Sequence, residues 1–273
     1  MRARWIYICG LVALLGACAG TKPAIDPDAS DKHYLLGSDY FSKNMLGPAL
    51  EELTKALELN RDNAEAMYLM GLISLRRAAE GEEQSLRAQC LKGDELKLEH
   101  DEVEKHFTDA QRRFAEAVKV RPDFSEAHNS LSVVALHYNR ADEAVKHAEK
   151  ALSNVLYRDQ YTAQGNLGAA HLARRDYARA SKALRQALFE QPKFCVGRFR
   201  LAKVYYEQAD LERASTEIEQ VVLDKACPIQ EAYHLAGLIA LKRQDREHAS
   251  QMFARCVAVA PKSCLAKECV IAQ

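Results

Sequence analysis

The chain has 273 residues, which is enough for one large domain or two small ones. It carries 38 basic and 38 acidic residues, and no basic face is evident that would favour nucleic acid as a partner. Glycine and proline are scarce (12 and 7 residues) and aromatic residues make up 7%, so the composition favours helices over sheets. An apolar fraction of 48% argues against disorder except near the N-terminus.

The first residues have the pattern of a secretory signal. Two arginines precede an apolar run over residues 5–15, which is too short to span a bilayer. The run ends in Leu-Gly-Ala-Cys at 15–18, which resembles the bacterial lipobox. The resemblance implies that residues 1–17 are removed and that Cys18 receives diacylglycerol and an N-linked acyl chain, such as palmitate. The alternative is an ordinary signal peptide that leaves a free cysteine.

The residue after the cysteine bears on the destination of the protein. Ala19 stands where an aspartate retains many bacterial lipoproteins at the inner membrane. By analogy with that sorting rule, we expect the protein at the outer membrane, facing the periplasm and held only by its lipid. Residues 18–30 include two prolines and show no helical period, so they predict a flexible tether.

The remaining chain is built from repeats. In the clearest copy, Gly168, Ala180, Leu184 and Pro192 have the spacing of a tetratricopeptide unit of about 34 residues, in which two antiparallel helices cross at small residues. Gly168 and Ala180 let the two backbones approach, Leu184 fills the space between them, and Pro192 ends the second helix. An unrelated helical bundle would not repeat a Gly or Ala that is followed twelve residues later by Ala.

These repeats predict an all-α chain that forms a superhelical tetratricopeptide-repeat solenoid of about six helix–turn–helix units. One unit cannot bury its own apolar face, so neighbouring units must stack. Residues 262–273 fit a short helix that caps the stack. The predicted units span about 30–63, 64–124 with an insertion at 79–105, 125–158, 161–194, 195–228 and 230–263.

The insertion at 79–105 places the second helix of unit two 27 residues late. It is highly charged, and Lys92-Gly93-Asp94 has the composition of a turn. We expect both helices of unit two to be lengthened into a projecting hairpin. The alternative is a flexible charged loop.

Eight cysteines become six in the mature protein once those at 9 and 18 are set aside. An even number in an oxidising compartment indicates disulfides. We predict Cys195–Cys227, at one edge of adjacent units, and one bond from Cys256 to Cys264 or Cys269 in the cap. Cys90 is left without an assigned partner, and free buried cysteines are the alternative.

No pattern in the sequence indicates catalysis. The nine histidines are scattered and form no H-E-x-x-H, and there is no G-x-S-x-G or phosphate-binding glycine loop. Cys264 and Cys269 lack the C-x-x-C pairs of a metal site. We therefore expect no enzymatic activity, no metal or other cofactor beyond the lipid on Cys18, and no small-molecule substrate.

In a tetratricopeptide solenoid the first helix of each unit lines a concave groove. Units one and two would present aromatic and aliphatic side chains there, as expected of a site for a peptide or a partner helix. Leu72 and Leu75 could instead pack against neighbouring units. The predicted groove residues are Tyr34, Phe41, Tyr68, Leu72, Leu75, Asn129, Val133, Leu136, Phe199, Lys203 and Tyr206.

The lipobox, the tether, six units and a final unit that contains L-A-G-L-I-A-L-K-R-Q-D-R-E-H-A together resemble the pilotins of type IV pili. This resemblance implies a lipid-anchored protein that binds secretin subunits and promotes their outer-membrane localisation and multimerisation. The insertion and the cysteine-rich C-terminal end depart from the simplest pilotins. Two alternatives stay open: an adaptor for a periplasmic protease or cell-wall hydrolase, and a structural component of an outer-membrane assembly machine.

Overall fold

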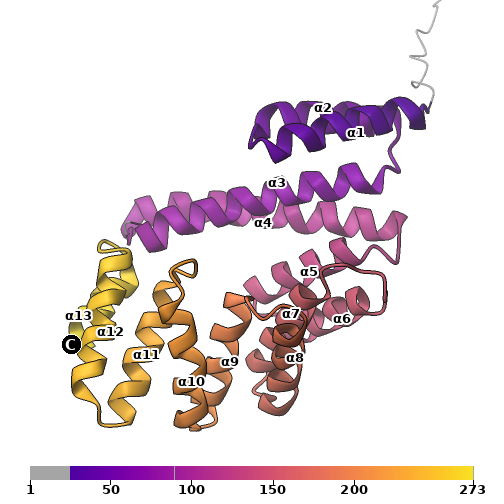
Figure 1. Ribbon diagram of the computed structural model, residues 1–273. Coiled ribbons are helices and arrows are strands. Elements are labelled where there is room, and N and C mark those ends of the chain that lie inside the picture. The colour runs from indigo at the N-terminus through magenta and orange to yellow at the C-terminus, as the bar shows by residue number, and fades with distance from the viewer. Residues whose placement is uncertain (1–24, 89, 273) are drawn as a thin grey trace, which may run out of the picture.

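The computed structural model describes residues 25–88 and 90–272, and the regular elements in these ranges are all helices (Figure 1). They pair into consecutive antiparallel hairpins that stack side by side, which confirms the predicted solenoid. The predicted signal peptide, Cys18 and most of the tether lie outside the described residues. The elements are α1 (Pro27–Ser42), α2 (Leu46–Leu59), α3 (Ala64–Glu82), η1 (Glu83–Ala88, a π-helix), α4 (Gly93–Val120), α5 (Ser125–His137), α6 (Ala141–Leu152), α7 (Gln160–Ala173), α8 (Tyr177–Glu190), α9 (Cys195–Glu207), α10 (Leu211–Leu223), α11 (Gln230–Lys242), α12 (Arg246–Val259) and α13 (Cys264–Ala272).

The first helix begins earlier than the sequence suggests. Residues up to 30 were expected to belong to the tether, whereas α1 starts at Pro27. The side chain of Asp26 accepts a hydrogen bond from the amide of Ala29 at 3.0 Å, and Pro27 occupies the first helical position, where its missing N–H is not needed. Local capping therefore shortens the tether.

The same turn ends the first helix of every unit except unit two. After α7, Arg175 is left-handed (φ 59°), and the amide of Asp176 donates to the carbonyl of His171 at 2.9 Å. This pair of features is a Schellman-type helix end, which turns the chain sharply into the second helix. The corresponding left-handed residues after the other first helices are Asn44, Asn139, Ala209 and Gln244.

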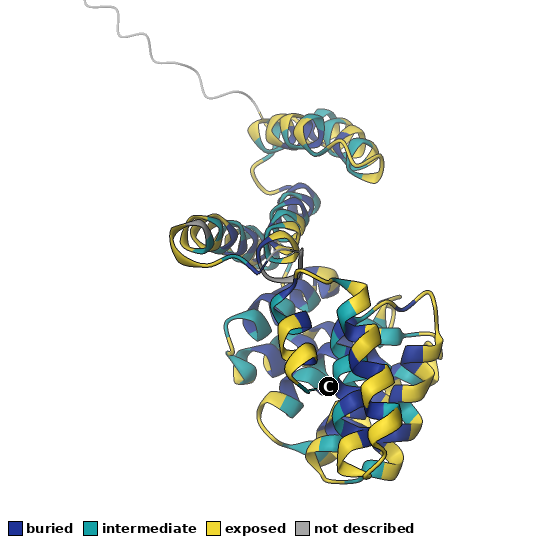
Figure 2. Ribbon diagram, turned by 90° about the vertical axis from the view of Figure 1, so that its left-hand side faces the viewer, coloured by how far each residue is buried: buried dark blue, intermediate teal, exposed yellow. Residues whose placement is uncertain are grey.

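In four units the two helices cross where the first helix has a glycine; Ser132 and Ala202 stand at this position in units three and five. A Cβ atom added to Gly168 would lie 2.5 Å from Leu184 Cγ, and one added to Gly71 would lie 2.5 Å from Phe114 Cε1. Both Leu184 and Phe114 are fully buried. Figure 2 shows the resulting pattern, in which buried residues lie where helices face one another and exposed residues cover the outside.

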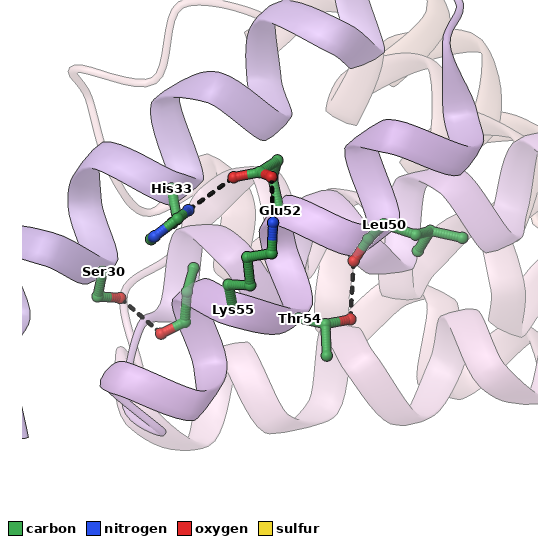
Figure 3. Close-up of polar contacts among 7 residues, drawn as sticks. Ser30, His33, Leu50, Glu52, Thr54 and Lys55 are labelled. Carbon is green, nitrogen blue, oxygen red and sulfur yellow. Dashed lines mark hydrogen bonds and ion pairs between the residues drawn. The ribbon is translucent and has the colours of Figure 1, made fainter. Parts of the chain in front are cut away.

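Polar contacts fix α1 on α2 in unit one (Figure 3). Ser30 Oγ donates to the carbonyl of Ala56 at 2.8 Å, and His33 Nδ1 lies 2.6 Å from Glu52 Oε2. Hydrogen bonds from Lys55 and His33 lower the pKa of the Glu52 carboxyl, so this group is ionised and holds both partners. These contacts set the position of the turn of α1 that carries Tyr34.

Unit two has the lengthened hairpin that the insertion predicts. Its first helix continues through η1, the chain turns at Gly93 (φ 63°), and α4 returns over 28 residues. The hairpin does not project freely, because η1 contacts α13 at the far end of the solenoid (Figure 1). Cys90 is bonded there to Cys264, with their Cα atoms 4.6 Å apart.

Two more disulfides join the C-terminal units. Cys195–Cys227 links the start of α9 to the residues before α11, and Cys256–Cys269 links α12 to the cap α13. Both pairings agree with the predicted ones. The bond of Cys90 was not anticipated. A parity argument could have found it, because a bond from Cys256 to one cap cysteine leaves only Cys90 for the other.

Candidate peptide-binding site

A pocket of about 470 Å³ opens between α1, α3 and the turn that joins α4 to α5. This volume is in the range of sites that enclose part of a small ligand or one or two side chains of a peptide. Two of the predicted groove residues, Tyr34 and Tyr68, line it together. The remaining lining residues are Glu65, Arg121, Asp123, Phe124, Glu126 and Asn154.

Aromatic rings form the apolar part of the pocket. The ring of Tyr68 packs against Phe114 and Phe124, with centroids 5.7 and 5.0 Å apart and tilted planes. Burial raises the pKa of Tyr68 to about 12 and also raises the pKa of Tyr34. Both phenols therefore stay neutral at physiological pH, and they offer a ring surface together with a hydroxyl that can hydrogen-bond a backbone group.

Charged side chains frame these rings. Arg121 forms an ion pair with Glu65, and its guanidinium carbon lies 3.5 Å from the centroid of the Phe124 ring. The pair and the stacking hold the long arginine side chain in one place. Asp123 and Glu126 add negative charge to the lining. The pocket suits an apolar side chain from a segment whose backbone or polar groups meet this charged frame.

Sequence reasoning missed the charged residues of this frame. The second position of each first helix also points into the groove, and it corresponds to Glu65 in α3 and Glu126 in α5. Applying this helical position to α3 and α5 could have identified both glutamates from the sequence. Arg121 and Phe124 lie in the turn before α5, which no helical position describes.

Beyond the pocket, the inner face becomes polar. Asn129 on α5 donates to Thr162 Oγ1 at 3.0 Å and accepts from Asn166 Nδ2 on α7 at 2.9 Å. Arg200 on α9 donates from Nη1 to Asn166 Oδ1 at 3.2 Å and to the carbonyl of Gly165 at 3.0 Å. A chain of hydrogen bonds therefore links three successive first helices at the same register.

The other predicted groove residues differ in how far they are buried. Phe41, Leu72, Leu75 and Leu136 pack partly buried against the clusters between helices, so they contribute to the stack as well as to its surface. Val133 is half-buried and Lys203 is exposed. Phe199 and Tyr206 pack against the large C-terminal cluster, and Lys242 Nζ lies 4.0 Å from the centroid of the Tyr206 ring. None of these lines the pocket at Tyr68.

The described residues contain neither a membrane-spanning helix nor a cluster of metal ligands. No helix within residues 25–88 and 90–272 combines the length and hydrophobicity needed to cross a membrane. In the same part of the chain, no three His, Cys, Asp or Glu side chains are grouped so that they could hold a metal ion.

Comparison with protein families identifies the repeats. One tetratricopeptide-repeat family model matches residues 104–161 and 166–228, and a second matches residues 230–263. Together these matches cover more than half of the chain. No curated protein sequence matches the chain.

Solved structures share the fold at low sequence identity. PilW, a widely conserved type IV pilus biogenesis factor, superposes with a TM-score of 0.69 at 20% identity, over 88% of this chain and 98% of that one. Pseudomonas aeruginosa pilF superposes with a TM-score of 0.67 at 16% identity, over 90% and 98%. YrrB, a tetratricopeptide-repeat protein with an unusual peptide-binding site, has a TM-score of 0.51 at 17% identity, over 81% and 99%.

Proposed function

Because this chain belongs to the tetratricopeptide-repeat proteins, we propose that it is a non-enzymatic scaffold that binds another polypeptide on the inner face of its solenoid. The observation that carries this proposal is the pocket at Tyr34 and Tyr68, where aromatic rings remain accessible beside an ordered ion pair. Burying one apolar side chain of a partner there would contribute about 1.5–3 kcal/mol. That is enough to select an apolar segment over a polar one.

We further propose that the partner is a secretin subunit and that the protein acts as a pilotin. The similarity of the fold to PilW and pilF supports this, together with the lipobox that ends at Cys18. In this mechanism the groove captures an apolar secretin segment and shields it from aggregation. The acyl chains on Cys18 hold the complex at the periplasmic face of the outer membrane, where secretin subunits multimerise.

The test is a gene deletion in the source bacterium, followed by complementation. Deletion should abolish secretin multimers while monomers persist, and the intact gene should restore them. Tyr34→Ala should restore them poorly, because it removes one ring of the pocket. Phe189→Ala is the matched control, since Phe189 is 82% exposed and lies outside the pocket, and it should complement fully. Normal secretin multimers in the deletion strain would reject the pilotin role and favour the adaptor or assembly-machine alternatives.

The lipid anchor has its own test. Cys18→Ser should remove the protein from the outer-membrane fraction, and the variant should lack the mass of the acyl chains. Cys9→Ser is the control, because Cys9 would be removed with the signal peptide. A Cys18→Ser protein that still fractionates with the outer membrane would contradict the proposed anchoring.

A further inference from the structure

A second cavity, of about 370 Å³, opens between α10, α11 and the start of α12. Here α11 packs against both α10 and α12 at the C-terminal end of the solenoid (Figure 1). The apolar floor of the cavity includes Ile218, Ile239 and Ala240, which are 1%, 2% and 4% exposed. The polar side chains around this floor include Ser215, Glu219, Arg243 and His248. None of the predicted groove residues lines the cavity, so it is separate from the inner-face site.

One unit earlier, the equivalent position carries a tyrosine ring. In the turn that ends α9, the amide of Asp210 donates to the carbonyl of Tyr205 at 2.9 Å. The turn that ends α11 has the same hydrogen bond, from Asp245 to Ala240 at 2.9 Å. Ala240 therefore has in unit six the position that Tyr205 has in unit five. Tyr205 is buried and packs within the large C-terminal cluster, so the cavity lies where unit six lacks this ring.

The two side chains that contact Tyr205 have counterparts at the cavity. Arg185 Nη1 donates to the hydroxyl of Tyr205 at 3.4 Å, and Glu219 has the same register on α10, 34 residues later. The guanidinium carbon of Arg213 lies 4.5 Å from the centroid of the Tyr205 ring. His248 has the place of Arg213 in unit six, because both amides donate to the aspartate that caps their helix. The cavity thus retains a polar contact for a hydroxyl and a planar group for a ring, with arginine replaced by glutamate.

Hydrogen bonds fix the polar wall of the cavity. Arg243 Nη1 donates to Ser215 Oγ at 2.6 Å, and Ser215 Oγ donates to Glu219 Oε1 at 2.8 Å. The second oxygen of Glu219, Oε2, accepts no hydrogen bond from any residue within 25–88 and 90–272. A carboxylate oxygen accepts hydrogen bonds, so this atom suits a ligand that presents an O–H group.

We propose that this cavity binds the side chain of a tyrosine from a partner polypeptide. The phenol ring packs on Ile218, Ile239 and Ala240, and its hydroxyl donates to Glu219. Tyr205 shows that this position between two units accommodates such a ring. A tyrosine combines an apolar ring with one polar tip, which matches an apolar floor with a carboxylate at its edge. The inference goes beyond the proposed function, because it adds a second contact surface outside the inner face.

The first measurement needs no variant of the protein. It uses the chain that lacks residues 1–18, with its disulfides formed, and p-cresol, which is the tyrosine side chain without its backbone. Methyl NMR should show that p-cresol shifts the resonances of Ile218 and Ile239, which line the cavity. Ile73 on α3 is the internal control, because it is fully buried away from the cavity and should not shift.

Peptides then test for a protein partner. A random peptide library is selected on the wild type and on Ala240→Tyr, in which the protein's own ring should fill the cavity. Tyrosine-containing binders of the wild type should bind Ala240→Tyr at least tenfold more weakly, because the partner's ring can no longer be buried. Ala258→Tyr is the matched control and should keep the wild-type affinity within about twofold, since Ala258 is exposed on α12 and lies outside the cavity.

The hydroxyl contact is tested with the same peptide. Replacing its tyrosine with phenylalanine should weaken binding to the wild type about fivefold, as expected for one lost hydrogen bond. In Glu219→Ala this replacement should have no effect, because the acceptor is absent. Thermal unfolding checks that both variants are folded, and if Ala240→Tyr is not, the p-cresol measurement on the wild type decides.

Three results would overturn this inference: unshifted Ile218 and Ile239 resonances with p-cresol, undiminished peptide affinity for Ala240→Tyr, or equal affinities for tyrosine and phenylalanine. Shifts with p-cresol but no tyrosine-containing binders would assign the cavity to a small phenol and would also reject a protein partner. The proposed function is unaffected by any of these results, because Tyr34 and Tyr68 lie outside this cavity.

Discussion

The crossing of α7 and α8 at Gly168 allows a quantitative test of how the repeats pack. A Cβ atom at Gly168 would lie 2.5 Å from Leu184 Cγ, 2.9 Å from Leu184 Cδ2 and 3.3 Å from the carbonyl oxygen of Ala180. Leu184 is fully buried, so its side chain has no free space to move into. Overpacking of this kind typically costs about 1–3 kcal/mol.

Two effects oppose each other in Gly168→Ala. The helix gains about 1 kcal/mol, because alanine is a better helix former than glycine. The steric clash with Leu184 outweighs or balances that gain, so the free energy of unfolding should fall by about 0–2 kcal/mol. The propensity effect is measured separately with Ala115→Gly, at an exposed position inside α4, which should destabilise by about 1 kcal/mol.

The assay is urea unfolding followed by circular dichroism, on the single variants and on a double variant. In a Leu184→Ala background the clash is absent, so Gly168→Ala should become stabilising. The coupling between the two sites should therefore be about 1–3 kcal/mol, equal to the steric term. If Gly168→Ala stabilises the intact protein by as much as Ala115→Gly destabilises it, the Cβ atom fits, and the close approach of the helices at Gly168 is not required.

Three further predictions concern strain and titration. The backbone of Ala209 is left-handed (φ 59°), so Ala209→Gly should raise the free energy of unfolding by about 1 kcal/mol, measured by urea unfolding. A decrease would show that the turn carries no strain. Because burial raises the pKa of Tyr68 to about 12, the folded state keeps a proton that the unfolded chain releases near pH 10. The free energy of unfolding should therefore fall as the pH rises from about 10 to 12, and Tyr68→Phe should reduce this fall. The Nδ1 atoms of His128 and His147 lie 3.0 Å apart, and burial lowers the pKa of both side chains. The unfolded chain therefore takes up more protons than the folded protein, and the free energy of unfolding should fall as the pH drops from about 7 to 5. His147→Gln should reduce that dependence, and an unchanged slope would exclude the pair as its source.

The repeats were predictable because each depends on local sequence. Gly168, Ala180 and Leu184 report a helix crossing that is complete within one unit, and the structure has the contacts that this spacing implies. The lengthened hairpin was predictable for the same reason, since the Lys92-Gly93-Asp94 turn and its flanking helical stretches are adjacent in the chain.

The features that depend on the superhelix have no local pattern that predicts them, and only the even number of cysteines pointed to the bond of Cys90. Cys90 and Cys264 are 174 residues apart, and they meet only because the curvature accumulated over several units brings the hairpin tip to the cap. No local pattern encodes that curvature. The ion pair at the pocket likewise joins residues far apart in the chain, because Arg121 at the end of α4 reaches Glu65 at the start of α3, 56 residues earlier, and also covers Phe124. Sequence register identified Tyr34 and Tyr68 as neighbours on one face, but the ion pair that frames them follows from three-dimensional packing.

The bond between Cys90 and Cys264 also determines how the molecule carries mechanical load. If the chain is pulled at its two ends, tension runs from unit one into α3 and η1, crosses the disulfide and enters α13. The residues between the two cysteines lie off this path, so units three to six, with Asn129, Asn166 and Arg200, bear none of the force. A protein tethered at one end and pulled at the other would stretch only its first unit, the start of its second and its cap, while units three to six keep their shape.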